Sequence, residues 1–445
     1  MLPNRTSLTR LGDVPTVEVR GRLQEVVGTL IKASGVQAKI GEWCELVTPG
    51  LESSSYAEVV GFYREQLLLM PMQGVAGLSS ATQVIPTGRT SRIAVGDEIL
   101  GRVLNGLGEP MDGLPLSRLL QQRSCIGQPP NPLARNPIDE VLPTGVRVID
   151  ALMTVGVGQR IGLFAPAGVG KSTLLGMLAR GAASDVNVIA LIGERGREVR
   201  EFIEQTLGEE GLRKSVVIVA TSDRSAIERM KAAYAATSIA EHFRDQGKRV
   251  LLLMDSLTRF ARAQREVGLA SGEPPTRRGY PPSLFAELPR LLERSGCNEN
   301  GSITAFYTVL TEGEDQDDPI AEEVRSILDG HIVMSRKLAE KNYYPAIDVL
   351  ASLSRIMGQV TSARHQQHAA MVRRLEAKYR DIELLVQIGE YQAGADSLAD
   401  EALMKHELVK QLLIQATDDF TDFDRILAEL EHIAQADTAQ ESSYD

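Results

Sequence analysis

Eight residues, 165–172, carry the clearest chemical signal in the chain. The run Ala-Pro-Ala-Gly-Val-Gly-Lys-Ser follows an apolar stretch, 161–164, and leads into a segment with the composition of a helix start. A strand, a glycine-rich turn and Lys-Ser at a helix N-terminus form a phosphate-binding P-loop, because glycines let backbone N–H groups converge on a phosphate. We predict that Lys171 reaches the β- and γ-phosphates of a nucleotide and that the Ser172 hydroxyl binds Mg²⁺.

The pattern expects glycine where the chain has Ala165, a departure that bears on the backbone angles of the turn more than on its chemistry. The residues predicted to contact the nucleotide in this turn are Ala167, Gly168, Val169, Gly170, Lys171, Ser172 and Thr173.

A carboxylate ends an apolar strand farther along the chain, where Leu251-Leu252-Leu253-Met254 precedes Asp255. In proteins with a P-loop such an aspartate steadies Mg²⁺, usually through water. Taken alone, Asp255 is more readily interpreted as an ordinary aspartate at a strand end that caps the next helix. Its pairing with Lys171 and Ser172 favours the Mg²⁺ role.

A charged segment, residues 193–200, follows the strand predicted directly after the P-loop helix. Because the carboxyl ends of neighbouring parallel strands face the same crevice, this segment should lie beside the phosphates. There Glu194 can polarise an attacking water, and Arg195 can bind γ-phosphate oxygens. The alternative is a charged helix start stabilised by pairs four residues apart.

Composition narrows the class of protein. The 445 residues are 43% hydrophobic and 24% charged, which is typical of a soluble globular protein of two or three domains. A net charge of −11 and a single tryptophan argue against nucleic acid as the main partner. Three well-separated cysteines indicate neither a disulfide framework nor a metal site, and fit a cytoplasmic location. We expect no secretory signal and no membrane span.

Three regions position these residues. Short runs punctuated by glycine predict a small N-terminal β-barrel over 1–88. A proline-rich connector and near-continuous apolar runs separated by helices predict an α/β core with a parallel sheet over 89–356. A C-terminal α-helical domain follows over 357–445. The five predicted core strands are 161–164, 186–192, 216–220, 250–255 and 303–309.

The helical periodicity of the C-terminal region rests on three apolar sets. The first helix carries Met371, Leu375, Tyr379, Ile382 and Val386, and the second Met404, Leu408 and Leu412. The third carries Phe423, Leu427 and Leu430, with Thr421 and Asp424 as its predicted cap.

Several longer motifs resemble the catalytic subunits of rotary ATP synthases and their export relatives. They are 101–108, 193–199, 255–260, 279–283 and 344–348. Within that group, 301–310, 327–333 and 388–392 resemble type III secretion ATPases, and 220–224 and 243–250 resemble the injectisome branch more than the flagellar one. The resemblance covers about residues 17–430 and implies a RecA-like P-loop core.

The resemblance also implies roles for individual residues. Glu194 matches the family's catalytic carboxylate, Arg195 its γ-phosphate contact, and Glu198 a group near metal-bound water. Arg355 matches an arginine that the neighbouring subunit supplies to the transition state, and Tyr344 matches an aromatic that stacks on adenine. Without the resemblance, we would interpret Arg355 as a surface arginine at the end of a strand. We would interpret Tyr344 as a residue that simply packs beside a proline.

The implied protein is a ring ATPase, a homohexamer that hydrolyses ATP with Mg²⁺ for a bacterial type III secretion system. It would release chaperones from exported proteins and unfold them. It would contact stator and central stalk proteins and associate peripherally with the cytoplasmic face of the inner membrane. Three alternatives remain at this point: a flagellar export ATPase, a Rho-like RNA helicase, and a non-catalytic nucleotide-binding ring subunit.

Two other features are interpreted as structural. We interpret one acidic stretch as a solvated loop, and the alternative is that it lines the central channel of the ring. Its residues are Glu312, Glu314, Asp315, Asp317 and Asp318. The six histidines show no spacing with carboxylates that favours a metal site.

Overall fold

The computed structural model describes residues 19–311 and 318–435, which group into two compact units. One unit contains the residues up to 91 together with 224–228 and 263–282, and the other contains the remainder. Four residues of the acidic stretch, 312, 314, 315 and 317, lie outside the described residues, as does the start of the N-terminal region.

The first unit contains a closed β-barrel, as the short glycine-punctuated runs predict. Its strands are β1 Gly21–Val27, β2 Leu30–Ser34, β3 Glu42–Val47, β4 Ser55–Tyr63, β5 Gln66–Pro71 and β6 Gln83–Thr90, joined in the order β1-β2-β5-β4-β3-β6. Alternate side chains such as Leu23, Ile31, Leu46 and Val59 fill its interior. This alternation follows from the two-residue period of a strand.

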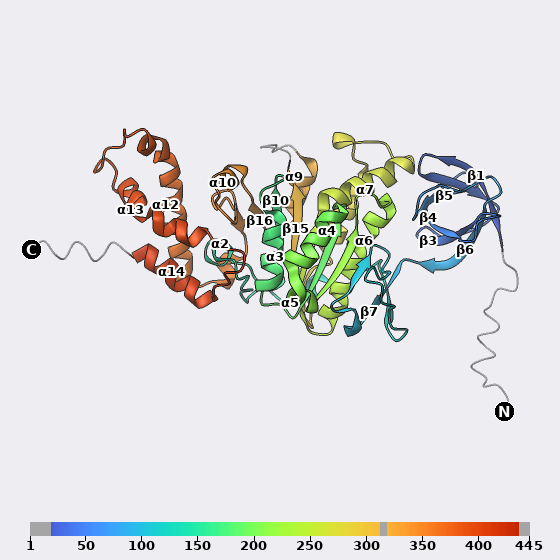
Figure 1. Cartoon of the computed structure of the whole chain (residues 1–445), viewed down its shortest axis with the longest axis horizontal. Helices are drawn as coiled ribbons and strands as arrows, with labels where there is room; N and C mark the ends of the chain where they lie inside the picture. The colour runs from blue at the N-terminus through green and yellow to red at the C-terminus, as the bar shows by residue number, and fades with distance from the viewer. Residues whose placement is uncertain (1–18, 312–317, 436–445) are drawn as a thin grey trace, which may run out of the picture. The chain divides into compact units, whose positions relative to one another are not determined.

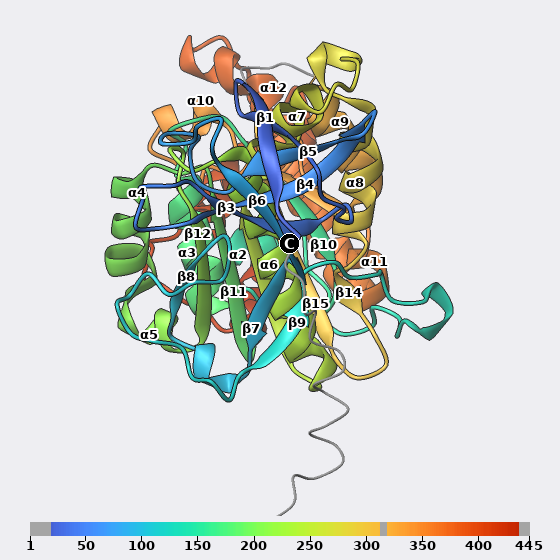
Figure 2. The ribbon, with the colours of Figure 1, turned by 90° about the vertical axis from the view of Figure 1, so that its right-hand side faces the viewer.

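The second unit is built on a sheet whose central strands are parallel, and the predicted α/β core is confirmed (Figures 1 and 2). All five predicted strands form, as β10 Arg160–Ala165, β11 Val186–Ile192, β12 Ser215–Ala220, β13 Arg249–Asp255 and β15 Ser302–Leu310. Their order in space is β10-β15-β13-β11-β12. Nearly every residue in them is buried, which explains their continuous apolar character.

Short strands extend this sheet at both sides: β8 Val103–Asn105 at one, and β16 Gly330–Val333 and β17 Leu353–Ser354 at the other. The two-residue strand β14 Gly296–Cys297 pairs antiparallel with β15 outside this order. Strand β16 runs parallel to β10, while β17 returns antiparallel along β16. A separate two-stranded ribbon pairs β7 Arg92–Val95 with β9 Gln121–Ser124.

Helices connect and cover the strands of the core. They are α2 Arg147–Leu152, α3 Lys171–Gly181, α4 Gly196–Glu201, α5 Gly208–Arg213, α6 Ala226–Asp245, α7 Leu257–Ala270, α8 Pro282–Leu292, α9 Pro319–Ile327, α10 Arg336–Glu340 and α11 Met357–Val360. A π-helical segment, Phe202–Leu207, joins α4 to α5. One apolar cluster unites a face of the sheet with α2, α3 and the C-terminal helices.

The C-terminal helices are α12 Ala363–Gln387, α13 Ser397–Leu413 and α14 Phe423–Gln435 (Figure 1). In α12 the predicted residues Leu375 and Ile382 are buried. In α13 the predicted face is partly wrong, because Met404 is 58% exposed. The side chain that caps α14 is Asp422, which accepts a hydrogen bond from the Asp424 backbone N–H, whereas the Thr421 hydroxyl bonds to Asp419. No helix in the described ranges has the length and apolarity needed to cross a bilayer.

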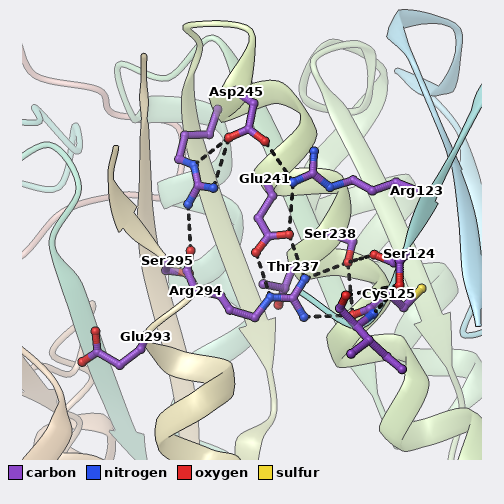
Figure 3. A network of polar contacts seen from close by, with 12 residues as sticks. Arg123, Ser124, Cys125, Thr237, Ser238, Glu241, Asp245, Glu293, Arg294 and Ser295 are labelled. Carbon is purple, nitrogen blue, oxygen red and sulfur yellow. Dashed lines mark hydrogen bonds and ion pairs between the residues drawn. The ribbon is translucent and has the colours of Figure 1, made fainter. Parts of the chain in front are cut away.

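A buried ionic network braces α6, α8 and the end of β9 (Figure 3). Arg294 forms two 2.8 Å contacts with the carboxylate of Glu241, and both residues are almost inaccessible to solvent. Arg294 also donates to the Cys125 carbonyl, and Arg123 of β9 pairs with Asp245. Because these charges are satisfied within the protein, the network fixes residues 123–125 against α6 and the segment that follows α8.

Candidate nucleotide site

The P-loop lies between β10 and α3, as its sequence predicts. Gly168 and Gly170 have φ angles of +82° and +85°, in the left-handed region that favours glycine. Gly170 directly precedes the first residue of α3, Lys171, so unpaired N–H groups of the helix start face the turn. Ala165 is the last, fully buried residue of β10 and lies in extended backbone, where alanine is unstrained. The substitution therefore leaves the turn intact.

Lys171, Glu194 and Asp255 converge at the carboxyl edge of the sheet. Asp255 ends β13, and Glu194 follows β11, the strand paired with β13. The Nζ atom of Lys171 donates to Oδ1 of Asp255 and lies 3.6 Å from Oε1 of Glu194. The sequence predicts this meeting, but it places strand 186–192 directly beside the P-loop strand, and that is wrong because β15 and β13 lie between β10 and β11. The residues still meet because all parallel strands of the sheet end at a common edge.

Glu194 is 8% exposed, and its surroundings favour a proton acceptor with an elevated pKa. Burial raises the pKa of Glu194 most, and the charge of Asp255 raises it further. Lys171 and Arg259 oppose this increase, while a hydrogen bond with Glu198 adds to it. Oε1 of Glu194 is buried, lies 3.6 Å from Lys171 Nζ and has no hydrogen-bond partner among the described residues.

Arg259 is a residue of the site to which the sequence motifs assign no role. Its Nη2 donates to Oε2 of Glu194 over 3.2 Å, and its Nη1 donates to the Gly193 carbonyl. A Cβ atom at Gly193 would lie 2.6 Å from the Cδ atom of Arg259, so glycine is required for this contact. The signal in the sequence is its place, since Arg259 lies in the first turn of α7, the helix that directly follows the strand ending at Asp255.

The oxygen donors at this edge fit Mg²⁺. Ser172 supplies a hydroxyl in the first turn of α3, and Asp255 supplies a carboxylate. Among the described residues there is no cluster of three His, Cys, Asp or Glu side chains that would form an all-protein metal cage. Mg²⁺ typically binds through one or two protein oxygens, substrate phosphates and water, so this sparse donor set suits it.

Arg195 and Glu198 lie beside the site without entering the Lys171 cluster. Arg195 precedes α4, and its side chain is 76% exposed. Its Nη1 lies 3.3 Å from Oε1 of Glu198, a surface pair of small energetic weight. Arg195 is therefore free to change partner when an anion is present.

Tyr344 lies next to the P-loop. A Cβ atom at Gly170 would meet the Tyr344 ring at 3.4 Å, and the tyrosine is 39% exposed. The carbonyl of Tyr344 accepts a hydrogen bond from the Gln415 backbone N–H over 2.9 Å. The Gln415 side chain in turn bonds to Gly145 and Arg147 at the start of α2. An exposed aromatic face is thus held beside the phosphate-binding turn.

Arg355 is not brought to the same site. It follows β17, whose Ser354 pairs with Gly330 at the amino end of β16. Its backbone N–H bonds to Asp329, and Nη2 lies 3.3 Å from the Arg325 carbonyl. The P-loop is at the opposite edge of the sheet, separated by the six residues of β10, on the order of 16 Å at about 3.3 Å per residue. Arg355 is exposed at its own edge.

Comparison with known proteins identifies the family. The chain is 59% identical over 407 residues to a type 3 secretion system ATPase of Xanthomonas euvesicatoria, covering 92% of each chain. A flagellum-specific ATP synthase of Bacillus subtilis is 51% identical, with 90% of this chain and 91% of that protein covered. The chain belongs to the type III secretion ATPase family. It is therefore an ATPase with a nucleotide-binding domain of the ATP synthase kind.

Family models and solved structures support this membership. The ATP synthase alpha/beta family nucleotide-binding domain matches residues 145–354, and its beta-barrel domain matches 23–88. The T3SS EscN ATPase C-terminal domain matches 361–432. The assembled ATPase EscN of enteropathogenic E. coli is similar with a TM-score of 0.88 and 48% identity, covering 93% of this chain and all of that one.

Proposed function

We propose that this type III secretion ATPase hydrolyses Mg-ATP at the carboxyl edge of its core sheet. The observation that carries the proposal is the position of Lys171 Nζ, between the carboxylates of Asp255 and Glu194. Lys171 is a cation held between two buried carboxylates beside a P-loop. In proteins with a P-loop, the terminal phosphates of the nucleotide and the bound Mg²⁺ lie at this position.

Each side chain has a distinct task in this proposal. Lys171 moves to the β- and γ-phosphates, while Ser172 and Asp255 hold Mg²⁺. Bound Mg²⁺ would neutralise charge on the phosphate oxygens. Glu194 orients the attacking water and accepts its proton through the unpartnered Oε1. Arg195 contacts the γ-phosphate, Glu198 lies near metal-bound water, and the Tyr344 ring stacks on adenine.

A ring of six copies explains the position of Arg355. Since Arg355 is exposed at the edge opposite its own P-loop, it can serve the site of a neighbouring subunit. An arginine supplied in this way stabilises the transition state of phosphoryl transfer and is worth roughly 10³-fold or more in rate. The related EscN was solved as an assembled ATPase, which supports assembly here.

The biological role proposed is protein export by a bacterial type III secretion system. Hydrolysis would release chaperones from exported proteins and unfold them, with stator and central stalk proteins as partners at the cytoplasmic face of the inner membrane. A related structure contains EscN with its central stalk EscO, which supports a stalk partner. Flagellar export remains the second candidate because a flagellum-specific relative is also 51% identical. Family membership sets aside the Rho-like helicase and the non-catalytic subunit.

The enzymatic proposal is tested with Glu194→Gln and Lys171→Ala. We expect Glu194→Gln to bind ATP but to lose turnover by at least about 100-fold, since it removes a general base. Lys171→Ala should abolish turnover. Phosphate release and calorimetric nucleotide binding are the measurements. Near wild-type turnover in Glu194→Gln would contradict the role of Glu194 as the base.

A separate test decides between the two export systems. The chain is expressed in one strain that lacks its injectisome ATPase and in another that lacks its flagellar ATPase, and the strain in which secretion is restored identifies the system.

A further inference from the structure

Thr308 lies in the strand between the one that leads into the P-loop and the one that ends at Asp255. It lies in β15, which pairs with β10 on one side and β13 on the other. In the register of these strands Thr308 is opposite Leu163 of β10, and its neighbour Tyr307 is opposite Met254 of β13. Thr308 is therefore level with the end of β13, where Asp255 lies.

The Thr308 hydroxyl contacts the site directly. Its Oγ1 donates a 2.8 Å hydrogen bond to Oδ1 of Asp255, the same oxygen that accepts from Lys171 Nζ. Thr308 is 0% exposed and Asp255 is 2% exposed, so water does not compete for this bond. A threonine side chain has few χ1 rotamers, and a fully packed strand restricts it further.

The two donors to Asp255 differ in what they do when nucleotide arrives. On the function proposed above, Lys171 moves to the phosphates and gives up the carboxylate. Thr308 has no such alternative, because it is enclosed in the middle of the sheet. The orientation of the Asp255 carboxylate then depends on the threonine.

We propose that Thr308 is a positioning residue that holds the Asp255 carboxylate in the orientation needed for Mg²⁺. The inference rests on the proposed function of the site. It adds a residue from a fourth strand, β15, and it explains why a hydroxyl interrupts the apolar sequence of that strand at this position.

A second threonine of the same strand provides the matched control. Thr304 is 2% exposed, and its Oγ1 accepts a 2.8 Å hydrogen bond from the Gly158 backbone N–H. It lies on the same face of β15 as Thr308, four residues earlier, and makes no contact with Asp255. Replacing either threonine by valine removes one buried hydroxyl of equal size, but only one of them contacts the site.

The test measures binding without turnover. ADP binding to the full-length chain is titrated by calorimetry in EDTA and over a series of Mg²⁺ concentrations, for wild type, Thr308→Val, Thr308→Ser and Thr304→Val. We expect Thr308→Val to need about tenfold more Mg²⁺ for its half-maximal effect, which corresponds to about 1.4 kcal/mol. Its affinity in EDTA should be unchanged. Thr308→Ser should recover wild-type behaviour, and Thr304→Val should retain it.

Three outcomes would overturn the proposal: a wild-type Mg²⁺ dependence in Thr308→Val, an equal defect in Thr304→Val, or no recovery in Thr308→Ser. Thr308→Ala is a second hydroxyl deletion for use if the valine variant does not fold. If wild type itself binds ADP without any Mg²⁺ dependence, the proposed function of the site fails. If ADP binding by wild type depends on Mg²⁺ and the Thr308 variants show the same dependence, the proposed function of the site stands and Thr308 has no positioning role.

Discussion

Arg259 bonds to the carboxylate of Glu194 across 3.2 Å, with its guanidinium also bonded to the Gly193 carbonyl. The two residues follow different strands, β13 and β11, that are paired in the sheet. Arg259 therefore joins the proposed base to the strand end that carries Asp255. The contact fixes Oε2 of Glu194, while Oε1 is buried without a hydrogen-bond partner among the described residues.

We expect Arg259→Gln to shift the acid limb of the kcat profile to higher pH. Arg259 lowers the pKa of Glu194 against the larger effect of burial, so loss of its charge should raise that pKa further. The base would then be protonated over a wider range of pH. ATP turnover measured from about pH 5.5 to about pH 9 checks this, with Arg259→Lys as the charge-conserving control. An unchanged acid limb in Arg259→Gln would show that the arginine does not influence the base.

Glu194→Gln should make the ligand-free protein more stable at neutral pH. The folded-state pKa of Glu194 is raised above its unfolded value, so its ionisation destabilises the fold increasingly as pH rises through the unfolded pKa towards the folded one. A neutral isostere removes this penalty. Below the unfolded pKa both side chains are neutral, and the difference should vanish. Melting temperatures of wild type and variant from about pH 4 to about pH 8 provide the measurement, and a variant that is less stable at the upper end would contradict the sign.

A mixing experiment tests whether Arg355 acts across a subunit boundary. Arg355→Ala keeps a complete P-loop edge but lacks the arginine, while Glu194→Gln lacks the base but keeps Arg355. Each alone should bind ATP with little turnover. In mixed rings, an Arg355→Ala site beside a Glu194→Gln neighbour has every group, so activity should reappear on mixing. A mixture no more active than its components would remove the intersubunit role.

Replacement of Tyr344 should affect binding more than the chemical step. The ring is exposed beside Gly170, and stacking of a base on an aromatic side chain is worth about 1–3 kcal/mol. Tyr344→Ala should therefore raise KM by about 5-fold to 150-fold with kcat nearly unchanged, and Tyr344→Phe should behave as wild type. Steady-state kinetics with ATP give both constants. A fall in kcat at constant KM would contradict a role in base stacking.

Loss of one partner from the buried ionic network of Figure 3 should strongly lower the free energy of unfolding. Arg294→Met leaves Glu241 buried with only the longer 3.4 Å contact to Arg123. Removing one member of a buried ion pair destabilises a protein by about 3–5 kcal/mol. Urea unfolding should show this loss, and the double variant Glu241→Leu with Arg294→Met should recover much of it. Equal stability of wild type and Arg294→Met would indicate that the network is energetically neutral.

Much of the architecture was accessible from sequence because the decisive patterns are local. The five core strands are buried on both faces, and their residues are accordingly almost all apolar. Lys171, Glu194 and Asp255 were expected to meet because each follows or precedes a strand at the same edge. This inference needs only the common direction of the strands, which the alternation of strands and helices supplies. The strand order was predicted wrongly, because strand 186–192 was expected beside the P-loop strand, whereas β15 and β13 lie between β10 and β11.

The remaining features depend on contacts between distant segments. Arg259 reaches Glu194 only because residue 193 has no side chain, and Thr308 reaches Asp255 only in the observed strand register. The exposed position of Met404 reflects which neighbours α13 packs against, which helical periodicity does not encode. Strands β16 and β17 are too short to give a pattern of their own.

The hydrogen bond from Gln415 to the Tyr344 carbonyl fastens the proposed base-stacking loop to the end of α13. The Gln415 side chain also donates a hydrogen bond to the Gly145 carbonyl and accepts one from the Arg147 backbone N–H, at the start of α2. The segment that follows α13 is consequently tied both to the loop that carries Tyr344 and to the start of α2. On the role proposed for Tyr344, we expect a chain truncated before α12 to bind adenine nucleotides more weakly, because the loop that carries the tyrosine would lose its hydrogen bond to Gln415.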